Sequence, residues 1–385
     1  MPLNPLLNAV GSLFKVYIRD SLLCEVWAMR CCLIYDEVFL KHETSPHHPE
    51  NPNRLIRIMK TLSEKNITKE VEILKPFKAS IEDLLLVHDE HYVKYVKRSI
   101  ESGHRYLDPD TPVCKDSFDV ALYAVGASIL GCEKLVSNNY DVCFVIQRPP
   151  GHHAGKAGIA LGAPTLGFCI FNNIAIAAKY LVDKLKLERV AIFDFDCHHG
   201  NGTQEIFYEN SSVLYISTHQ DGRTAYPGTG FISEVGEGEG KGFNINIPLP
   251  PNTADDVYRE VISEVVEKVI RAYKPKMLLF SAGFDAHKDD PITSMNLSIA
   301  SYVRIAEMIK KLRDDGVVSK FLFILEGGYG PGLPKGMYNL IAFLSGKRAL
   351  EHEDETRSTS SIKHSGLKVI KKVIDDILKP YWGLE

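Results

Sequence analysis

The sequence predicts an α/β protein built on one doubly wound, mainly parallel β-sheet with helices on both faces. Short continuous apolar runs, typical of strands buried on both faces of a parallel sheet, recur along the chain. Segments with apolar residues at three- and four-residue intervals alternate with these runs, as crossover helices do. The 385 residues contain no internal repeat and no Ser- or Pro-rich linker that would divide the chain.

The N-terminal 29 residues are partly apolar but interrupted by charges at Lys15, Arg19, Asp20 and Glu25. No run reaches the ~18 uncharged residues that a membrane span needs, so we expect no membrane anchor. A signal peptide is disfavoured because a basic n-region and a small-residue cleavage site are both missing. We interpret residues 1–30 as an N-terminal extension, either an amphipathic helix or a misassigned start, and residues 31–385 as a single domain.

The expected elements alternate along the rest of the chain. Strands are expected at 31–39, 142–146, 190–196, 212–218, 244–249, 277–283 and 321–328. Helices are expected at 53–62, 83–100, 117–136, 171–186, 254–273, 298–314, 335–346 and 366–378. Loops are expected at 42–52, where His42, His47 and His48 favour loop structure over chemistry, at the glycine-rich 236–242, and at 350–363, a charged segment that we expect to be mobile.

Composition narrows the possible partners and the compartment. A net charge of −4 supplies no overall cationic field, so direct binding of nucleic acid is not expected. The eight cysteines are scattered without a C-x-x-C pair, which favours free thiols in a reducing, cytoplasmic setting.

The stretch 189–204, RVAIFDFDCHHGNGTQ, is the most informative part of the sequence. Residues two apart in a strand point the same way, so Asp194, Asp196 and His198 are expected to share one side. Clustered carboxylates repel each other unless a cation or a base binds them. A polar loop after a strand is the plainer interpretation, but this pattern after an apolar run favours a site for a divalent cation.

Three further strand ends carry unusual residues. His152 and His153 follow the strand at 142, Asp285 follows the strand at 277, and Tyr329 follows the strand at 321. Ligands of doubly wound sheets gather beyond the carboxyl ends of the strands, so we expect these residues at one edge. Asp196, His198 and Asp285 would leave a coordination position open, which is typical of catalytic rather than structural zinc.

The histidine pair and the tyrosine suggest hydrolysis of an amide. We expect Asp194 to orient His152 and Asn201 to hold His153, so that a charged and a neutral partner give the two rings different roles. The Tyr329 hydroxyl, flanked by glycines, is the expected donor to a tetrahedral oxyanion.

Eight segments resemble the histone deacetylase superfamily, including its prokaryotic deacetylase-like and acetylpolyamine amidohydrolase members. They lie in the family's order between residues 31 and 345: HPENPNRL (48–55), RPPGHHA (148–154), GFCIFNN (167–173), DFDCHHGNGTQ (194–204), STH (217–219), YPGTG (226–230), SAGFDAH (281–287) and EGGY (326–329). The resemblance implies the arginase-deacetylase fold and one catalytic zinc ion per chain. It also implies that His153 is the general base and acid, that His152 backed by Asp194 gives electrostatic help, and that Tyr329 polarises the carbonyl.

The same resemblance implies further binding residues. Gly167, Phe168 and Tyr226 would line a narrow channel for an extended acyl-amine side chain, and Asp110 falls where a rim carboxylate grips substrate backbone, although the local match is poor. Structural potassium ions are implied near the zinc ligands and near a second group of residues, comprising Asp194, Ser217 and Thr218 for the first and Phe207, Asn210, Val213 and Phe243 for the second. Asn201 stands where some members have Asp, and the Asn form is similar to the class II and prokaryotic branch.

The sequence therefore favours zinc-dependent removal of acetyl groups from protein lysines. The alternative is an acetylated polyamine or another small acylamine, which apolar Ile292 at the expected channel mouth disfavours because it offers no anionic grip. A catalytically silent acyl-lysine-binding protein is disfavoured because every polar catalytic position is present, and a two-metal ureohydrolase because such a site wants more carboxylates. A homo-oligomer stays open as an assembly.

Overall fold

The computed structural model describes residues 28–347 and 349–385, so residues 1–27 of the expected N-terminal extension lie outside the described residues. Its centre is an eight-stranded sheet in which every neighbouring pair is parallel, in the order β10-β9-β8-β11-β12-β5-β1-β2. The strands are β1 (Cys31–Ile34), β2 (Glu72–Leu74), β5 (Val142–Val145), β8 (Val190–Asp194), β9 (Val213–Gln220), β10 (Asn244–Leu249), β11 (Met277–Ala282) and β12 (Phe321–Leu325). Two short antiparallel pairs lie outside the sheet: β3 (Tyr106–Asp108) with β4 (Thr111–Pro112), and β6 (Ala154–Gly155) with β7 (Gly158–Ile159).

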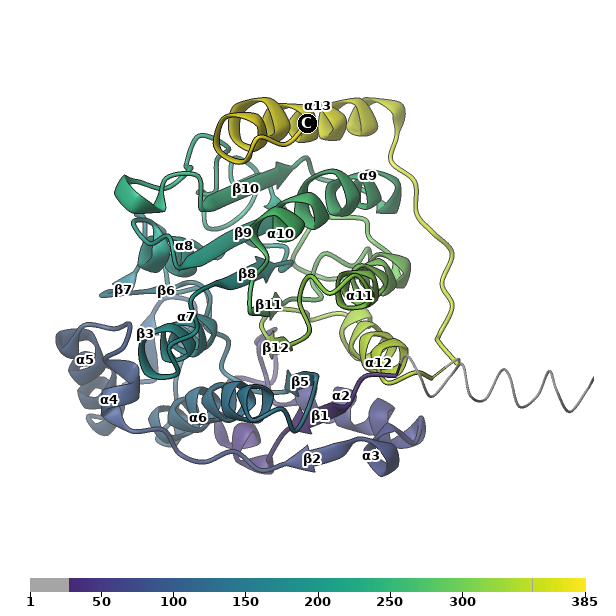
Figure 1. Ribbon diagram of the computed structural model, residues 1–385. Coiled ribbons are helices and arrows are strands. Elements are labelled where there is room, and N and C mark those ends of the chain that lie inside the picture. The colour runs from purple at the N-terminus through teal and green to yellow at the C-terminus, as the bar shows by residue number, and fades with distance from the viewer. Residues whose placement is uncertain (1–27, 348) are drawn as a thin grey trace, which may run out of the picture.

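Helices cover both faces of this sheet (Figure 1). One layer contains α6 (Ser117–Val136), α7 (Asn173–Lys179) and α8 (Asn201–Phe207), with α4 (Ile81–Leu84) and α5 (Glu90–Glu101) outside it. The other layer contains α2 (Asn53–Glu64), α9 (Asp255–Val261), α10 (Glu267–Tyr273), α11 (Ile299–Asp314) and α12 (Gly332–Leu344). The remaining helices are α3 (Ile67–Glu70) beside β2 and α13 (Ser360–Val373) beside β10. This confirms the predicted doubly wound architecture.

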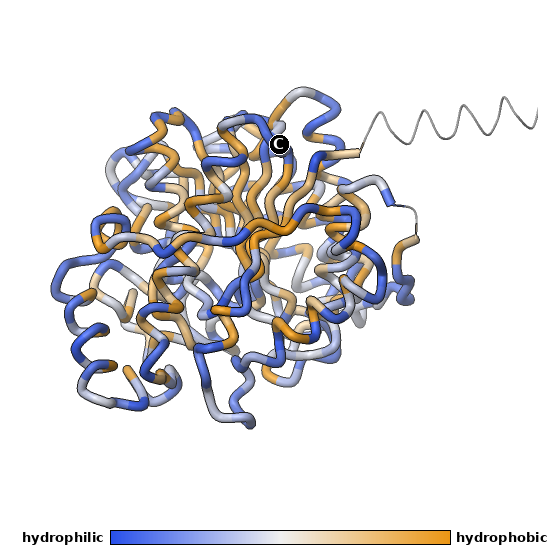
Figure 2. The backbone as a smooth tube through the Cα atoms, turned by 90° about the horizontal axis from the view of Figure 1, so that it is seen from below, coloured by the Kyte–Doolittle hydropathy of each residue, from blue (hydrophilic) through white to orange (hydrophobic). Residues whose placement is uncertain are grey.

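Aromatic residues fix the register of the central strands. The Phe280 and Phe323 rings stack at 4.2 Å between centroids, and Phe144 stacks on Phe323 at 4.7 Å. These residues are paired across β11, β12 and β5, and Phe193 of β8 is paired with Phe280. The apolar centre of the sheet is visible in Figure 2. Because the strands are locked at this level, β5, β8, β11 and β12 end close to the same line.

Some predicted elements end earlier than expected or are divided in two. The first strand ends at Ile34, because the Asp36 side chain accepts a hydrogen bond from the Val38 amide (2.8 Å) and starts a 3₁₀ turn at Glu37–Lys41. The helix predicted over 83–100 is two helices, α4 and α5. A capping box formed by Ser80 and Asp83 begins α4, and a new helix starts after Asp89.

The charged segment at 350–363 is predicted to be mobile, but in the structure hydrogen bonds attach it to the rest of the fold. Glu353 accepts hydrogen bonds from the Ile299 amide (2.9 Å) and contacts His287 Nε2 (3.0 Å), while Thr356 bonds to buried Asp255. Helix α13 begins at Ser360, six residues before the predicted start, and continues as a π-helical stretch at Ile374–Trp382. Among the described helices, none has the length and apolarity needed to cross a membrane.

Candidate active site

The candidate site lies at the edge where the central strands end. Strand β8 stops at Asp194, so the expected alternation does not continue to Asp196 and His198, which lie in the following turn. The turn nevertheless points both side chains to one place, because the His198 amide donates to Asp196 Oδ1 (2.8 Å). Asp194 faces a different partner, His152.

Asp196, His198 and Asp285 bring three potential metal-binding atoms together. His198 Nδ1 lies 3.1 Å from Asp196 Oδ1 and 3.0 Å from Asp285 Oδ2. The three ligand atoms all lie within 4.8 Å of one another, and both carboxylates are fully buried. Asp285 comes from the loop after β11, so two neighbouring strands supply the cluster.

The residues of this cluster fit a zinc ion. Asp285 Oδ2 is buried and, among the described residues, has no hydrogen-bond partner of adequate geometry, although His198 Nδ1 is near. A Cβ atom at Gly327 would lie 2.3 Å from Asp285 Oδ2 and 2.5 Å from Asp196 Oδ2, so this glycine of the EGGY loop leaves the carboxylates room. Two carboxylates and one imidazole are a donor set that suits catalytic zinc.

The two buried carboxylates of the cluster have pKa values shifted in opposite directions. Burial, reinforced by the neighbouring carboxylate of Asp196, raises the pKa of Asp285 to about 7, although His198 opposes this. Burial would also raise the pKa of Asp196, but His152 and His198 outweigh it and lower that pKa. A bound cation would stabilise both ionised carboxylates.

The two histidines of the GHH turn have different partners. His152 Nδ1 lies 3.0 Å from Asp194 Oδ2, whereas His153 Nδ1 lies 2.8 Å from the amide oxygen of Asn201. Burial lowers the pKa of His152, but the carboxylates of Asp194, Asp196 and Glu326 outweigh it and raise this pKa to about 10. Burial and the charges of His152 and His198 lower the pKa of His153 well below its usual value.

Tyr329 and two other aromatic residues, Phe168 and Tyr226, pack near the histidine pair and the EGGY loop. The Tyr329 ring lies edge-on to Phe168 (5.9 Å), and Tyr226 lies edge-on to His153 (4.8 Å). Burial raises the pKa of Tyr329 well above its usual value, so its hydroxyl keeps its proton at neutral pH. Gly167 permits the close packing, since a Cβ there would lie 2.6 Å from His153 and 2.8 Å from Tyr226.

The two candidate rim residues, Asp110 and Ile292, form hydrogen bonds with residues outside the metal-binding cluster. Asp110 uses both carboxylate oxygens on threonine hydroxyls, Thr111 (2.9 Å) and Thr165 (2.5 Å). Ile292 is 41% exposed, with its amide donating to Asp290. Asp290 also accepts from the amides of Tyr329 and Gly330, so it holds the tyrosine loop.

The candidate potassium residues lie in two groups, and each group includes residues of β9. Asp194 is paired with Ser217 across the sheet, and the Thr218 hydroxyl donates to the Asp194 carbonyl (3.4 Å). In the second group, Asn210 Oδ1 accepts from the Val213 amide, while the carbonyls of Phe207 and Phe243 accept the amides of Asn210 and Tyr215. A potassium ion at either place stays a prediction.

Sequence reasoning names neither Glu326 nor Arg54 as a site residue, and it assigns His48 to a loop. Glu326 is fully buried beside the histidine turn, and Arg54 lies 4.9 Å from the Tyr329 ring centroid. His48 packs edge-on against Phe168 at 4.7 Å. Arg54 and His48 lie in HPENPNRL and Glu326 in EGGY, so membership of these segments was the signal available.

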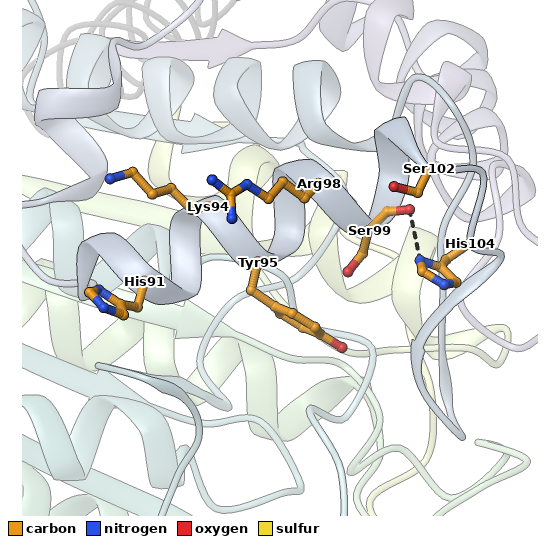
Figure 3. A pocket seen from close by; sticks show the side chains of 7 residues that line it. All are labelled: His91, Lys94, Tyr95, Arg98, Ser99, Ser102 and His104. Atoms are coloured by element: carbon orange, nitrogen blue, oxygen red, sulfur yellow. Dashed lines mark hydrogen bonds between the residues drawn. The ribbon is translucent and has the colours of Figure 1, made fainter.

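The hollow drawn in Figure 3 lies elsewhere, on helix α5. It has a volume of about 490 Å³, and its lining contains none of the candidate site residues (His91, Lys94, Tyr95, Arg98, Ser99, Ser102 and His104). The chemistry is therefore assigned to the strand ends and not to this surface.

Comparison with known proteins agrees with the geometry. The family model described as histone deacetylase domain matches residues 48–342. This chain belongs to the histone deacetylase family. It is 42% identical to a probable deacetylase of Archaeoglobus fulgidus, over 82% of this chain and 86% of that protein. It is 32% identical to the histone deacetylase-like amidohydrolase of Pseudomonas aeruginosa, over 83% of this chain and 87% of that protein.

The fold comparison identifies the architecture. The crystal structure of the HDA15 HD domain matches with a TM-score of 0.81 and 32% identity, covering 92% of this chain and 96% of that one. The protein therefore has the arginase-deacetylase fold of the histone deacetylase family, and it is a hydrolase with deacetylase activity.

Proposed function

We propose that this deacetylase removes acetyl groups from lysine side chains of proteins, with one zinc ion held by Asp196, His198 and Asp285. The observation that carries the proposal is the meeting of the His198 imidazole with two buried carboxylates, Asp196 and Asp285, beside a histidine pair. A zinc ion in such a site acidifies a water molecule and polarises a carbonyl oxygen. The implied potassium ions would be structural.

The histidines would divide the proton transfers between them. His153 Nδ1 faces an acceptor oxygen on Asn201, so the neutral ring carries its proton there and leaves Nε2 free to take one. His152 faces the Asp194 carboxylate, which stabilises its charged form. His153 would thus act as general base and then as acid to the leaving amine, and His152 would stabilise the developing negative charge.

Tyr329 and the channel residues would complete the site. The protonated Tyr329 hydroxyl would donate to the oxyanion as it forms. Gly167, Phe168 and Tyr226 would line the path of the extended acyl-lysine side chain, and Asp110 would meet substrate backbone at the rim. Exposed Ile292 gives that rim an apolar surface, which suits a peptide better than the second ammonium of a polyamine.

Metal analysis tests the ligand set. We expect about one zinc per purified chain, and we expect His198→Ala to weaken zinc binding by ~100-fold or more because a ligand is removed. The matched control is His104→Ala on the α5 hollow, which should keep its zinc. Full zinc occupancy of His198→Ala would contradict the assignment.

A comparison of substrates tests the substrate class. We expect kcat/KM for an acetyl-lysine peptide to exceed that for an acetylated diamine by about 10-fold or more, because a polar group left unpaired costs about 1–3 kcal/mol and each 1.4 kcal/mol is about tenfold. A clear preference for the diamine would reverse our ordering and assign the enzyme to small acylamines.

A further inference from the structure

Glu326 lies where three parts of the site meet. It follows β12 directly, is fully buried, and its amide donates to the Ala282 carbonyl at the end of β11 (3.1 Å). Its own carbonyl accepts a hydrogen bond from the Arg54 guanidinium. Two hydrogen bonds therefore hold the Glu326 backbone, in addition to the contacts of its side chain.

The Glu326 side chain holds the turn that carries the histidine pair. Its Oε2 accepts hydrogen bonds from the amides of Gly151 (2.7 Å) and His152 (3.3 Å). Both amides lie outside the helices and strands, so no ladder satisfies them. Gly151 is also packed tightly, since a Cβ there would lie 2.5 Å from the Phe171 carbonyl oxygen. A carboxylate is a strong acceptor for such buried amides.

The residues after Glu326 lead directly to the other half of the site. The Gly327 amide donates to Asp196 Oδ2 (2.8 Å), and Tyr329 follows two residues later. We propose that Glu326 is a positioning residue, whose carboxylate keeps the His152–His153 turn in register with the Tyr329 loop. The proposal deepens the proposed function and rests on it for its kinetic consequences.

Two substitutions separate positioning from charge. Glu326→Ala removes the acceptor, and we expect kcat to fall ~10- to 100-fold with KM changed less than ~3-fold, because small misplacements of reacting groups have effects of this size. Glu326→Gln keeps an oxygen for both amides, and we expect it to recover most of kcat. A Gln variant as impaired as the Ala variant would overturn the proposal.

The matched control is another buried carboxylate away from the site. Asp255 accepts hydrogen bonds from the Ser298 amide (3.0 Å), the Ser301 hydroxyl (2.6 Å) and Thr356. We expect Asp255→Ala to lower the melting temperature while kcat per zinc-loaded site is unchanged. If Glu326→Ala behaves in the same way, its role is only structural and the proposal fails.

A double-mutant cycle tests the link to the tyrosine. If Glu326 acts by holding the His152–His153 turn and the Tyr329 loop in their relative positions, Glu326→Ala should lower kcat much less in a Tyr329→Phe background than in the wild type. Losses that multiply in full would contradict the link.

Amide hydrogen exchange tests the positioning without any substrate. We expect segments 149–155 and 327–331 to exchange faster together in Glu326→Ala and to recover in Glu326→Gln. Unchanged exchange at 149–155 would overturn the proposal. If the wild-type protein hydrolyses no acylamine, the proposed function fails, while this exchange measurement still decides the role of Glu326.

Discussion

At the scale of single residues, two adjacent histidines have hydrogen-bond partners of different charge. His152 meets a carboxylate oxygen of Asp194, and His153 meets an amide oxygen of Asn201. The charged partner stabilises an imidazolium and the neutral one does not, so the rings hold their protons differently. Asp196 also lies 3.9 Å from His152, so a cation bound to Asp196 would lower the pKa of His152 from its present raised value.

The Tyr329 hydroxyl is the residue-scale feature most open to a direct test. Tyr329→Phe removes one oxyanion donor, and we expect kcat to fall by ~100-fold or more while zinc stays bound. The ring contacts with Phe168 and Arg54 are retained, so the melting temperature should change little. Tyr106→Phe, on an exposed tyrosine, is the control and should leave kcat unchanged. Unaltered turnover in Tyr329→Phe would remove the tyrosine from the chemistry.

At the scale of elements, every strand of the central sheet except β2, and the edge at which the strands end, could be predicted from the sequence. Short continuous apolar runs such as 142–146 are typical of strands buried on both faces of a parallel sheet, and the polar residues after such strands meet at one edge. The structure brings Asp196, His198 and Asp285 together there.

Other elements could not be predicted, because their cause lies in distant contacts. The break at Asp89 divides a continuous helical pattern, and the Asp89 amide bonds instead to the Lys156 carbonyl (2.8 Å). The composition of the 350–363 segment predicts mobility, but Glu353 and Thr356 form hydrogen bonds with residues that are distant in the sequence. Glu326 was overlooked for the same reason, since its partners lie 174 and 175 residues away.

At the scale of the whole molecule, a buried charge network lies behind the site. Glu50 accepts hydrogen bonds from the guanidinium groups of Arg148 (2.7 Å) and Arg54 (3.1 Å), and all three side chains are buried. Arg54 continues to the carbonyl of Gly328 (2.8 Å), next to Tyr329. The network therefore connects the loop before α2, the segment after β5 and the tyrosine loop after β12.

Because of this network, we expect the free energy of unfolding to fall as the pH becomes acidic. Burial would raise the pKa of Glu50, but Arg148, with His42 and Arg54, outweighs it and lowers the pKa to about 2. Because this folded-state value is below the ordinary value of 4.5, the stabilisation is complete above pH ~4.5 and is lost as pH falls towards about 2. The loss corresponds to about 3 kcal/mol for this one group. Glu50→Gln should therefore unfold at lower urea concentration than wild type at pH 7, and the gap in unfolding free energy should narrow as pH falls from 5 to 2. The control is Glu64→Gln on the exposed face of α2, which should keep the wild-type pH dependence. If the difference in unfolding free energy between wild type and Glu50→Gln stayed constant with pH, the Glu50 carboxylate would not be the group that titrates.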